Sequence, residues 1–361
     1  MKEPLLASTV PANDENDGIV AVPSRSAAAF STLPAPTTGT IVKLGEGRLN
    51  SSATLANFVG EVQVREGEFA LTGVGQIGNA KTAHATVMVF DGASFVTATE
   101  SGSKLAQYVE FTIIGEGHNG KGAIRDESAV AAGNFFNGGK WTLAGDAMVC
   151  THNEERMGID ESAVIDLAGH TLTLTGDLEN KKVYFLIGKV AVKNPPVGDA
   201  IVVRDVRLLL QSGEECTFEG SAANVLKFEG PSSSLRLYWN RAKCLPWTVD
   251  CYDGMQIIAD GKYDYDEYDG TDDYFMGPFY LRGTTKVGSN TKSFIGQGLN
   301  LRGYVYGPGG LTVSTSSDDY NSSLMLDCPT NAFEGPVTIT GRPYADSTGA
   351  TRYSSLILNA N

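Results

Sequence analysis

One stretch of the sequence, residues 230–282, gathers most of the side chains that could do chemistry. It holds a large share of the chain's 14 Tyr and 3 Trp residues. These aromatic residues are Tyr238, Trp239, Trp247, Tyr252, Tyr263, Tyr265, Tyr268, Tyr274 and Tyr280. The same stretch carries nine acids, Asp250, Asp253, Asp260, Asp264, Asp266, Glu267, Asp269, Asp272 and Asp273. Metal binding and sugar binding are the two chemistries that this mixture indicates.

The acids Asp264, Asp266 and Asp269, with Gly270 after them, predict a Ca²⁺ loop. Calcium takes several carboxylate oxygens, and a nearby glycine allows the chain to wrap tightly around the ion. The spacing does not match the EF-hand pattern, since the third acid and the glycine come one place late. The alternative is a solvated acidic loop that keeps an exposed sheet edge soluble.

The aromatic residues predict a sugar-binding surface, in which rings stack on the faces of sugars and carboxylates bind their hydroxyls. The candidate ligand-binding residues are Trp239, Trp247, Tyr263, Tyr265 and Tyr268. The alternative is that the two tryptophans and several tyrosines form a small local core that anchors this stretch.

An enzyme is a further alternative, although the residues single out no catalytic set. A glycoside hydrolase needs two carboxylates flanking the scissile bond, and here many acids compete for that assignment. A polysaccharide lyase needs a base and a cation. Lys262, Tyr263, Arg236, Arg241 and Arg282 are available for those roles. There is no nucleophile elbow, phosphate-binding loop or dinucleotide fingerprint. The sequence therefore favours a protein without catalytic activity.

Short strands must position these residues. Apolar and polar residues alternate with a period of two along much of the chain, between Gly, Asn, Asp and Ser. Val62, Val87 and Val109 recur at 25 and 22 residues. This spacing predicts a parallel β-solenoid, in which each turn buries its apolar face only by stacking on its neighbours. A β-sandwich would give similar turn signals, but repeated glycine corners and small inward residues favour the solenoid.

Three phrases carry a resemblance to a known family. They are the Gly-x-Gly-Gly-Leu start at 307–311, the Asn-x-Phe-x-Gly-x-Val-x-Ile-x-Gly end at 331–341, and the Ile-Asp-Leu-x-Gly-His-Thr-Leu-Thr-Leu run at 165–174. They resemble the autotransporter-associated β-strand repeat, clearly over residues 44–73, 122–176 and 303–341. The resemblance implies a right-handed parallel β-helix of a secreted bacterial surface protein. The family usually carries a C-terminal membrane barrel, which this sequence lacks, so we expect a passenger-like fragment or a relative exported by another route.

Composition limits the function further. The net charge of −14 argues against nucleic acid as a partner, because phosphates would be repelled. No apolar run reaches the ~20 residues of a membrane span. Residues 1–17 lack the apolar core of a signal peptide, so either the signal is absent from this chain or the protein is cytoplasmic; the composition favours a secreted or cell-surface location. The five cysteines suit no zinc site; Cys244 and Cys251 predict either a small disulfide loop or buried thiols.

The sequence thus predicts an all-β, right-handed parallel β-helix over residues 41–361. An arm, linker or cap precedes it at 1–40, and an irregular aromatic and acidic insertion interrupts it at about 230–282. The favoured function is a secreted adhesive or structural module that binds a polysaccharide or a surface protein. The alternatives are a polysaccharide-degrading lyase or hydrolase, and a fibre or coat subunit that associates end to end.

Overall fold

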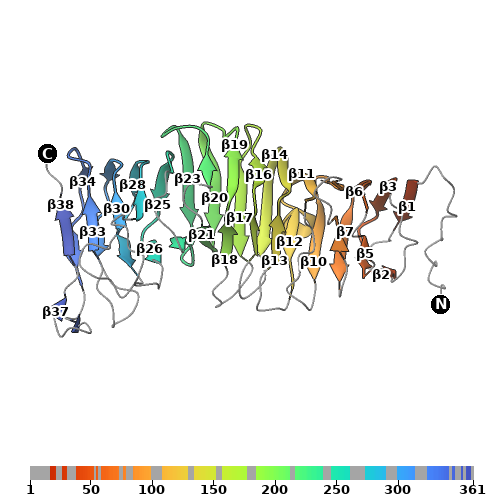
Figure 1. The fold of residues 1–361 in the computed structure, drawn as a ribbon, viewed down its shortest axis with the longest axis horizontal. Coiled ribbons are helices and arrows are strands. Elements are labelled where there is room, and N and C mark those ends of the chain that lie inside the picture. The colour runs from red at the N-terminus through yellow and green to blue at the C-terminus, as the bar shows by residue number, and fades with distance from the viewer. Residues whose placement is uncertain are drawn as a thin grey trace. The chain divides into compact units, whose positions relative to one another are not determined.

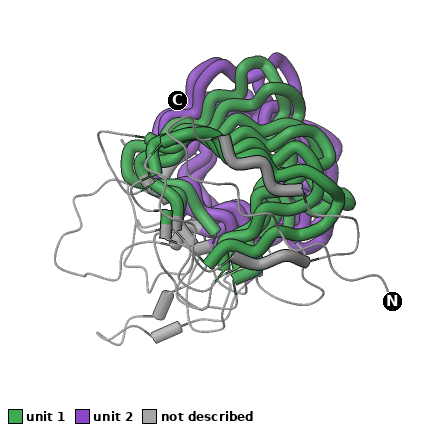
Figure 2. The backbone as a smooth tube through the Cα atoms, turned by 90° about the vertical axis from the view of Figure 1, so that its right-hand side faces the viewer, with its two compact units in different colours: residues 1–184 green, residues 185–361 purple. Residues whose placement is uncertain are grey.

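The computed structural model describes 19 stretches of the chain, which belong to two compact units, residues 1–184 and 185–361 (Figure 2). The described residues are 17–21, 27–30, 38–52, 54–55, 58–72, 76–78, 84–98, 108–128, 134–151, 157–176, 184–211, 216–238, 245–260, 273–289, 299–313, 323–340, 344–345, 351–352 and 355–358. Each unit is a coil of short strands that pair in parallel with strands one turn away.

In unit 1 two long ladders of parallel strands run along the coil (Figure 1). The first contains β1 (Asp17–Ala21), β3 (Thr40–Leu44), β6 (Glu61–Val64), β9 (Thr86–Val89), β11 (Glu110–Gly115), the start of β14 (Lys140–Thr151) and β16 (Ala163–Asp166). The second contains β2 (Ala27–Phe30), β4 (Arg48–Ser51), β7 (Gly67–Thr72), β10 (Ala93–Ala98), β12 (Ile124–Asp126), the end of β14 and β17 (Leu172–Gly176). Shorter pairs are β5 (Thr54–Leu55) with β8 (Gln76–Ile77) and β13 (Asn134–Asn137) with β15 (Met157–Asp160).

Unit 2 has three such ladders and one short pair, β19 (Val190–Lys193) with β22 (Thr217–Phe218). The outer ladder, as we call it, contains β20 (Gly198–Arg204), β23 (Asn224–Glu229), β25 (Thr248–Cys251), β28 (Phe279–Leu281), β31 (Val305–Gly307) and β34 (Ala332–Phe333). The end ladder contains β18 (Tyr184–Ile187), β21 (Arg207–Gln211), β24 (Ser234–Tyr238), β26 (Gln256–Asp260), β29 (Thr285–Ser289), β32 (Leu311–Val313) and β35 (Val337–Ile339). The third ladder contains β27 (Asp273–Phe275), β30 (Leu299–Leu301), β33 (Ser323–Leu326) and β38 (Ser355–Leu358). In addition, β36 (Tyr344–Ala345) pairs antiparallel with β37 (Thr351–Arg352).

The core of each unit consists of stacked columns of apolar side chains. In unit 1, Leu49, Phe69 and Phe95 are paired in register on successive strands and are fully buried. The Phe69 and Phe95 rings stack with centroids 6.0 Å apart. Each such side chain contributes roughly 1.5–3 kcal/mol by leaving water. Because strands of one ladder repeat the same inward positions, one turn of the coil prepares the surface on which the next turn packs.

Glycines at one corner of unit 2 allow neighbouring turns to approach closely. A Cβ atom added to Gly309 would lie 2.0 Å from the carbonyl oxygen of Gly283, and one on Gly335 would lie 2.5 Å from the carbonyl carbon of Gly309. No side chain fits that space, so the glycines that the sequence repeats are required by the contact between turns.

The predicted right-handed parallel β-helix is confirmed, and three details of the prediction change. Val62 pairs with Val87 as expected, but the next partner of Val87 is Phe111, not Val109. The valine spacing missed this because Val109 lies just before β11 begins. The arm at 1–40 contains β1 and β2, which pair with β3 and β4, so the ladders begin before residue 41.

The irregular insertion is narrower than 230–282. The strands β24, β25, β26 and β28 from this stretch occupy regular ladder positions. Residues 239–244 and 261–272 lie outside the described residues.

Two further expectations concern helices and cysteines. In the part of the chain that the structure describes, the one helix is a 3-10 turn at His118–Gly120, and no helix has the length and apolarity to cross a bilayer. Cys251 is a free, buried thiol. The disulfide alternative for Cys244 and Cys251 is therefore wrong, because Cys251 points into the core of its ladder.

Candidate functional site

Most of the site residues chosen from the sequence lie outside the described residues. These are Trp239, Tyr263, Tyr265 and Tyr268 of the sugar-binding set, and Asp264, Asp266 and Asp269 of the calcium set. Trp247 is described and is fully buried; its indole N–H donates to the Glu219 carbonyl at 2.7 Å, and its ring packs edge-on against Phe218. For this residue the structure supports the alternative of a local core.

A different group of side chains comes together on the outward side of the outer ladder of unit 2. In β25, β28 and β31 the inward residues Val249, Phe279 and Val305 are fully buried. The alternate positions therefore point outward. We call the group formed there by Asp250, Tyr280, Arg282, Tyr304 and Tyr306 the tyrosine–arginine surface. It draws on β25, β28 and β31, which are paired in register.

A two-point ion pair joins Asp250 to Arg282 across neighbouring strands. Arg282 Nε donates to Oδ1 at 2.7 Å and Nη2 to Oδ2 at 2.6 Å. The Asp250 side chain is 9% exposed and that of Arg282 is 53% exposed. These hydrogen bonds raise the pKa of the Arg282 guanidinium, so it remains charged. The two bonds fix the direction of the pair and leave three of the five donor hydrogens of the guanidinium available to a ligand.

Three tyrosine rings lie beside this pair. The Tyr304 and Tyr306 rings stack with centroids 5.1 Å apart and planes 11° apart, and Tyr280 lies 5.1 Å from Tyr306 at a tilt of 43°. The Arg282 guanidinium lies over the Tyr280 ring, 5.5 Å from its centroid. Tyr304 is 36% exposed. Burial, helped by the charge of Asp250, raises the pKa of Tyr306, so its phenol stays neutral and can donate a hydrogen bond.

Exposed ion pairs extend the surface toward β20 and β23. Lys227 Nζ lies 3.0 Å from Asp199 and 3.0 Å from Glu229, and Arg204 contacts Glu229 at 3.0 Å. The hydrogen bond that Lys227 donates to Glu229 lowers the pKa of Glu229, and the hydrogen bonds that Lys227 donates to Asp199 and Glu229 raise the pKa of Lys227. Carboxylates and cations balance here, so the whole stretch carries no strong field of either sign.

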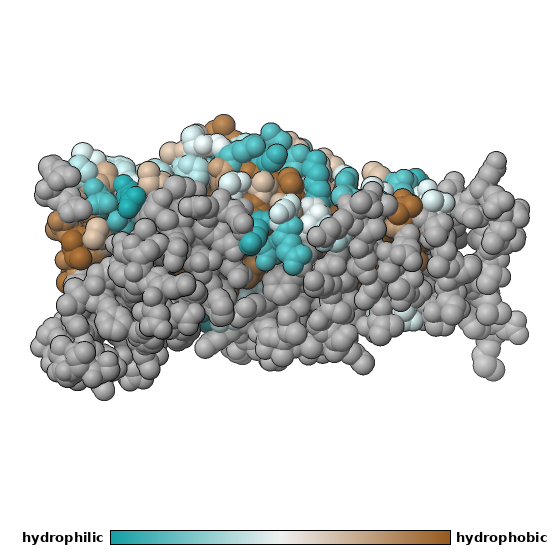
Figure 3. All heavy atoms as spheres, in the orientation of Figure 1, coloured by the Kyte–Doolittle hydropathy of each residue, from teal (hydrophilic) through white to brown (hydrophobic). Residues whose placement is uncertain are grey.

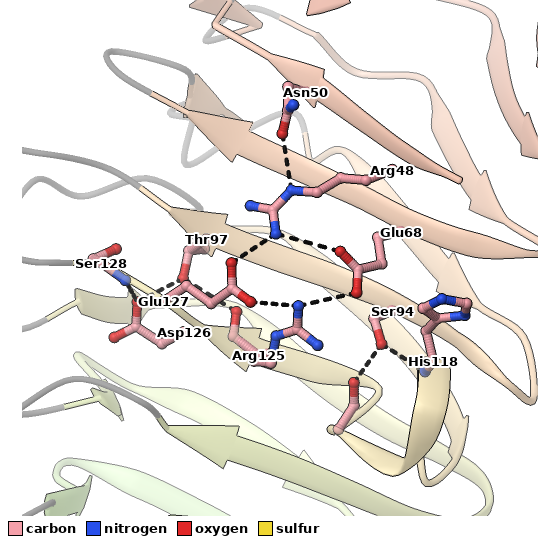
Figure 4. Close-up of polar contacts among 11 residues, drawn as sticks. Arg48, Asn50, Glu68, Ser94, Thr97, His118, Arg125, Asp126, Glu127 and Ser128 are labelled. Atoms are coloured by element: carbon pink, nitrogen blue, oxygen red, sulfur yellow. Dashed lines mark hydrogen bonds and ion pairs between the residues drawn. The ribbon is translucent and has the colours of Figure 1, made fainter. Parts of the chain in front are cut away.

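Unit 1 has a buried counterpart on the outward side of β4, β7 and β12, the arginine–glutamate cluster of Arg48, Glu68, Arg125 and Glu127 (Figure 4). Arg48 Nη1 contacts Glu127 at 2.7 Å and Glu68 at 3.3 Å. Arg125 Nη2 contacts Glu68 at 3.0 Å and also contacts Glu127. The side chains of Arg125 and Glu68 are only 5% and 12% exposed. Arg125 and Glu68 therefore pair away from most of the solvent, while Arg48 and Glu127 are each 27% exposed.

The described residues suit binding better than catalysis. A glycosidase needs a general acid whose pKa is raised, yet Glu229 has a lowered pKa and Asp250 is bound by Arg282. Burial lowers the pKa of Lys43 to about 8, a useful value for a base. Its ammonium, however, is fully buried and donates to the carbonyls of Leu44, Gly45 and Glu66 at 2.6–3.1 Å, so no substrate can reach it.

Sequence reasoning noted Asp250, Tyr280 and Arg282 within the 230–282 stretch but did not select them, and it missed Tyr304 and Tyr306. A signal was present. Tyr280 and Tyr306 are 26 residues apart, the same separation as Thr285, Leu311 and Val337 on the end ladder. Equal separation places both tyrosines at one position of successive turns. Among the described residues no group of three or more His, Cys, Asp or Glu could hold a metal ion.

Comparisons with family models, curated proteins and solved structures gave no match. What the structure shows is therefore the fold, a parallel β-helix.

Proposed function

We propose that this chain is a non-catalytic β-helix module, secreted or displayed at a cell surface, that binds a polysaccharide through the tyrosine–arginine surface. The observation that carries the proposal is the stack of Tyr304 and Tyr306 next to the fixed Asp250–Arg282 pair. A sugar ring has an apolar face of C–H groups and a rim of hydroxyls. Flat aromatic rings fit the face, and the half-exposed Arg282 guanidinium, which Asp250 holds in direction, can donate to the rim.

The arrangement of this surface along the ladder also suits a polymer. Tyr280 and Tyr306 occupy equivalent positions on strands that are ~4.8 Å apart. Asp250 and Arg282 flank them on the same outward side. A chain of linked sugars that lies along the ladder would meet a tyrosine on each of β28 and β31 and the Asp250–Arg282 pair beside them. The resemblance to the autotransporter-associated β-strand repeat agrees with such a surface module, and the parallel β-helix supports it.

The test is retention and turnover measured together. The whole protein is passed over immobilised plant, algal and host polysaccharides, neutral and acidic, with Ca²⁺ present, while released oligosaccharides are quantified. We expect retention on at least one polymer without release. The double variant Tyr280→Ala/Tyr304→Ala should lose retention. Tyr184→Ala, which removes a half-buried tyrosine on another strand, should keep it.

Two results would overturn the proposal. Oligosaccharide release that persists in highly purified protein would assign an enzyme. Retention that is unchanged in the Tyr280→Ala/Tyr304→Ala variant would place binding elsewhere on the chain.

The calcium loop at Asp264, Asp266 and Asp269 remains a separate part of the proposal. Its support is the spacing of the acids. A chelator should lower the melting temperature of the wild-type protein, and Asp264→Ala/Asp266→Ala should remove that response. A wild-type protein whose melting ignores the chelator has no such site.

A further inference from the structure

The ion pairs on the outward side of the outer ladder join equal numbers of acidic and basic side chains. The acids are Asp199, Glu229 and Asp250, and the bases are Arg204, Lys227 and Arg282. Their formal charges sum to zero. The charge that a ligand of this surface can carry therefore depends on how these groups are paired.

Lys227 is held between two acids. Its Nζ lies 3.0 Å from Asp199 and 3.0 Å from Glu229, and Glu229 also contacts Arg204 at 3.0 Å. An anionic sugar that approached the Lys227 ammonium would approach both carboxylates as well. Like charges at that range repel, so Lys227 gives an acidic polymer no net attraction.

Arg282 is neutralised in the same way. Asp250 takes two of its hydrogen bonds, at 2.7 and 2.6 Å. A carboxylate or sulfate of a ligand would have to compete with Asp250 or place a second negative charge beside it. A sugar hydroxyl adds no charge and needs only one of the donor hydrogens that remain. The guanidinium thus suits a hydroxyl better than an anion.

The surroundings of these ion pairs also disfavour an acidic polymer. The rings of Tyr280, Tyr304 and Tyr306 offer apolar contact that needs no charge on the ligand. In Figure 3 the described residues at the top of unit 2, where Figure 1 labels β23, β25 and β28, are a mixture of hydrophilic and hydrophobic ones. The chain as a whole carries a net charge of −14, which repels a polyanion at long range.

We propose that the tyrosine–arginine surface binds a neutral polysaccharide and excludes acidic ones, an inference that rests on the proposed function. The favoured polymer carries hydroxyls but no carboxylate, sulfate or phosphate groups. Discrimination between two ligands often needs a repulsive element against the wrong one. Here the repulsive element is the pair Asp199 and Glu229, whose charges a neutral polymer does not oppose.

The test compares polymers that differ only in charge. Soluble starch, β-glucan and galactomannan are the neutral probes, and each is compared with its own derivative in which primary alcohols are oxidised to carboxylates. Titration calorimetry of the whole protein measures both affinities. The oxidised form of the bound polymer should bind about tenfold more weakly at low salt. This difference should shrink in about 1 M salt, where the Debye length is about 3 Å.

A double variant assigns the exclusion to the two acids. Asp199→Asn/Glu229→Gln removes two negative charges from the surface and should raise the affinity for the oxidised polymer about tenfold. The affinity for the neutral polymer should stay the same. The matched control is Glu61→Gln/Glu110→Gln, which removes the same charge from β6 and β11 of unit 1 and should leave both affinities unchanged.

The outcomes separate this inference from the proposed function. An oxidised polymer that binds as tightly as its neutral parent, and is lost in Tyr280→Ala/Tyr304→Ala, would overturn the inference and leave the proposed function in place. Equal effects of the two acid variants would also overturn it, because the selectivity would then follow from net charge alone. Failure of every neutral and oxidised polymer to bind would overturn the proposed function, and this inference with it.

Discussion

The arginine–glutamate cluster of unit 1 and the tyrosine–arginine surface of unit 2 use the same ion pair in opposite surroundings. Both lie on the outward side of a strand ladder. In unit 1 the Arg125 side chain is 5% exposed and contacts two carboxylates. In unit 2 the Arg282 side chain is 53% exposed and contacts one carboxylate and one aromatic ring. An arginine surrounded by carboxylates holds a fold together, whereas one with free donors beside aromatic rings can hold a ligand.

The contrast has an energetic basis. A buried charge that loses its partner keeps the full cost of desolvation, while an exposed charge regains water. Removing one member of the buried cluster should therefore damage the fold. Removing an exposed ring of the tyrosine–arginine surface, such as that of Tyr304, should damage binding and leave the fold largely intact.

The largest expected effect is on Arg125. Arg125→Ala leaves Glu68 and Glu127 to share Arg48 alone, so one negative charge of the cluster is uncompensated, and the unfolding free energy should fall by about 3–5 kcal/mol. Urea denaturation, followed by tryptophan fluorescence, measures it. The matched control is Arg204→Ala, whose side chain is 48% exposed and should cost less than about 1 kcal/mol. Equal losses for the two variants would remove the distinction between buried and exposed pairs.

The next effect is on binding through Arg282. Arg282→Lys keeps the charge but loses the two-point bond to Asp250 and the flat contact with Tyr280. Affinity for the retained polysaccharide should fall about tenfold, which corresponds to about 1.4 kcal/mol. Titration calorimetry measures the affinity, and a melting curve measures the fold, which should change little. A fall in melting temperature as large as that of Arg125→Ala would make Arg282 a structural residue.

Acid should weaken unit 1 through Glu127. Burial, the largest influence, raises the pKa of this carboxyl, but hydrogen bonds and charges from Arg48 and Arg125 together lower it below the ordinary value of 4.5. A group with a lowered folded pKa stabilises the fold above the unfolded pKa, and this contribution is lost as pH falls through the folded pKa. We expect the unfolding free energy to fall below about pH 4.5.

Glu127→Gln is the variant that isolates this contribution. Its stability should vary less with pH over that acid range than the stability of the wild-type protein. Matched pH profiles of urea denaturation check it, and identical profiles would contradict the assignment to Glu127.

The smallest effect concerns the exposed pairs around Lys227. Lys227→Met removes the contacts with Asp199 and Glu229 and should change the unfolding free energy by about 0–1 kcal/mol. That difference should vanish at high salt, because the Debye length shrinks to about 3 Å at 1 M. Melting curves at low and high salt test it. A difference that persists at high salt would show that this pair is protected from the solvent.

The fold was largely predictable from the sequence because every turn of a β-helix must meet the same packing requirements. Each turn needs inward apolar residues at alternate positions and a small residue at each corner, and both requirements are visible as patterns in the amino-acid sequence. The register was harder. Val109 has the right chemistry to follow Val87, but Phe111 takes that place, since the position at which a strand begins depends on the loop before it.

The candidate site was less predictable. A count of aromatic residues favours the region where they are densest in sequence, near Tyr263 and Tyr265. The tyrosine–arginine surface instead joins Asp250, Tyr280 and Tyr306 from separate turns, so these residues become neighbours only when strands pair. The prediction for Trp247 failed in a different way. This residue lies in the aromatic-rich region, but its side chain is fully buried and therefore cannot contact a ligand.

The 26-residue separation of Tyr280 and Tyr306 also has a consequence for how such a surface changes. One turn of the coil is a unit of packing and, in the proposed function, also a unit of recognition. Duplication of a single turn would add another ring at the same lateral position without disturbing the turns on either side. The gain would come as avidity, since a second contact with the same polymer is intramolecular and strengthens retention without a new type of contact. Lengthening the coil is therefore a route to tighter binding that leaves each individual site unchanged.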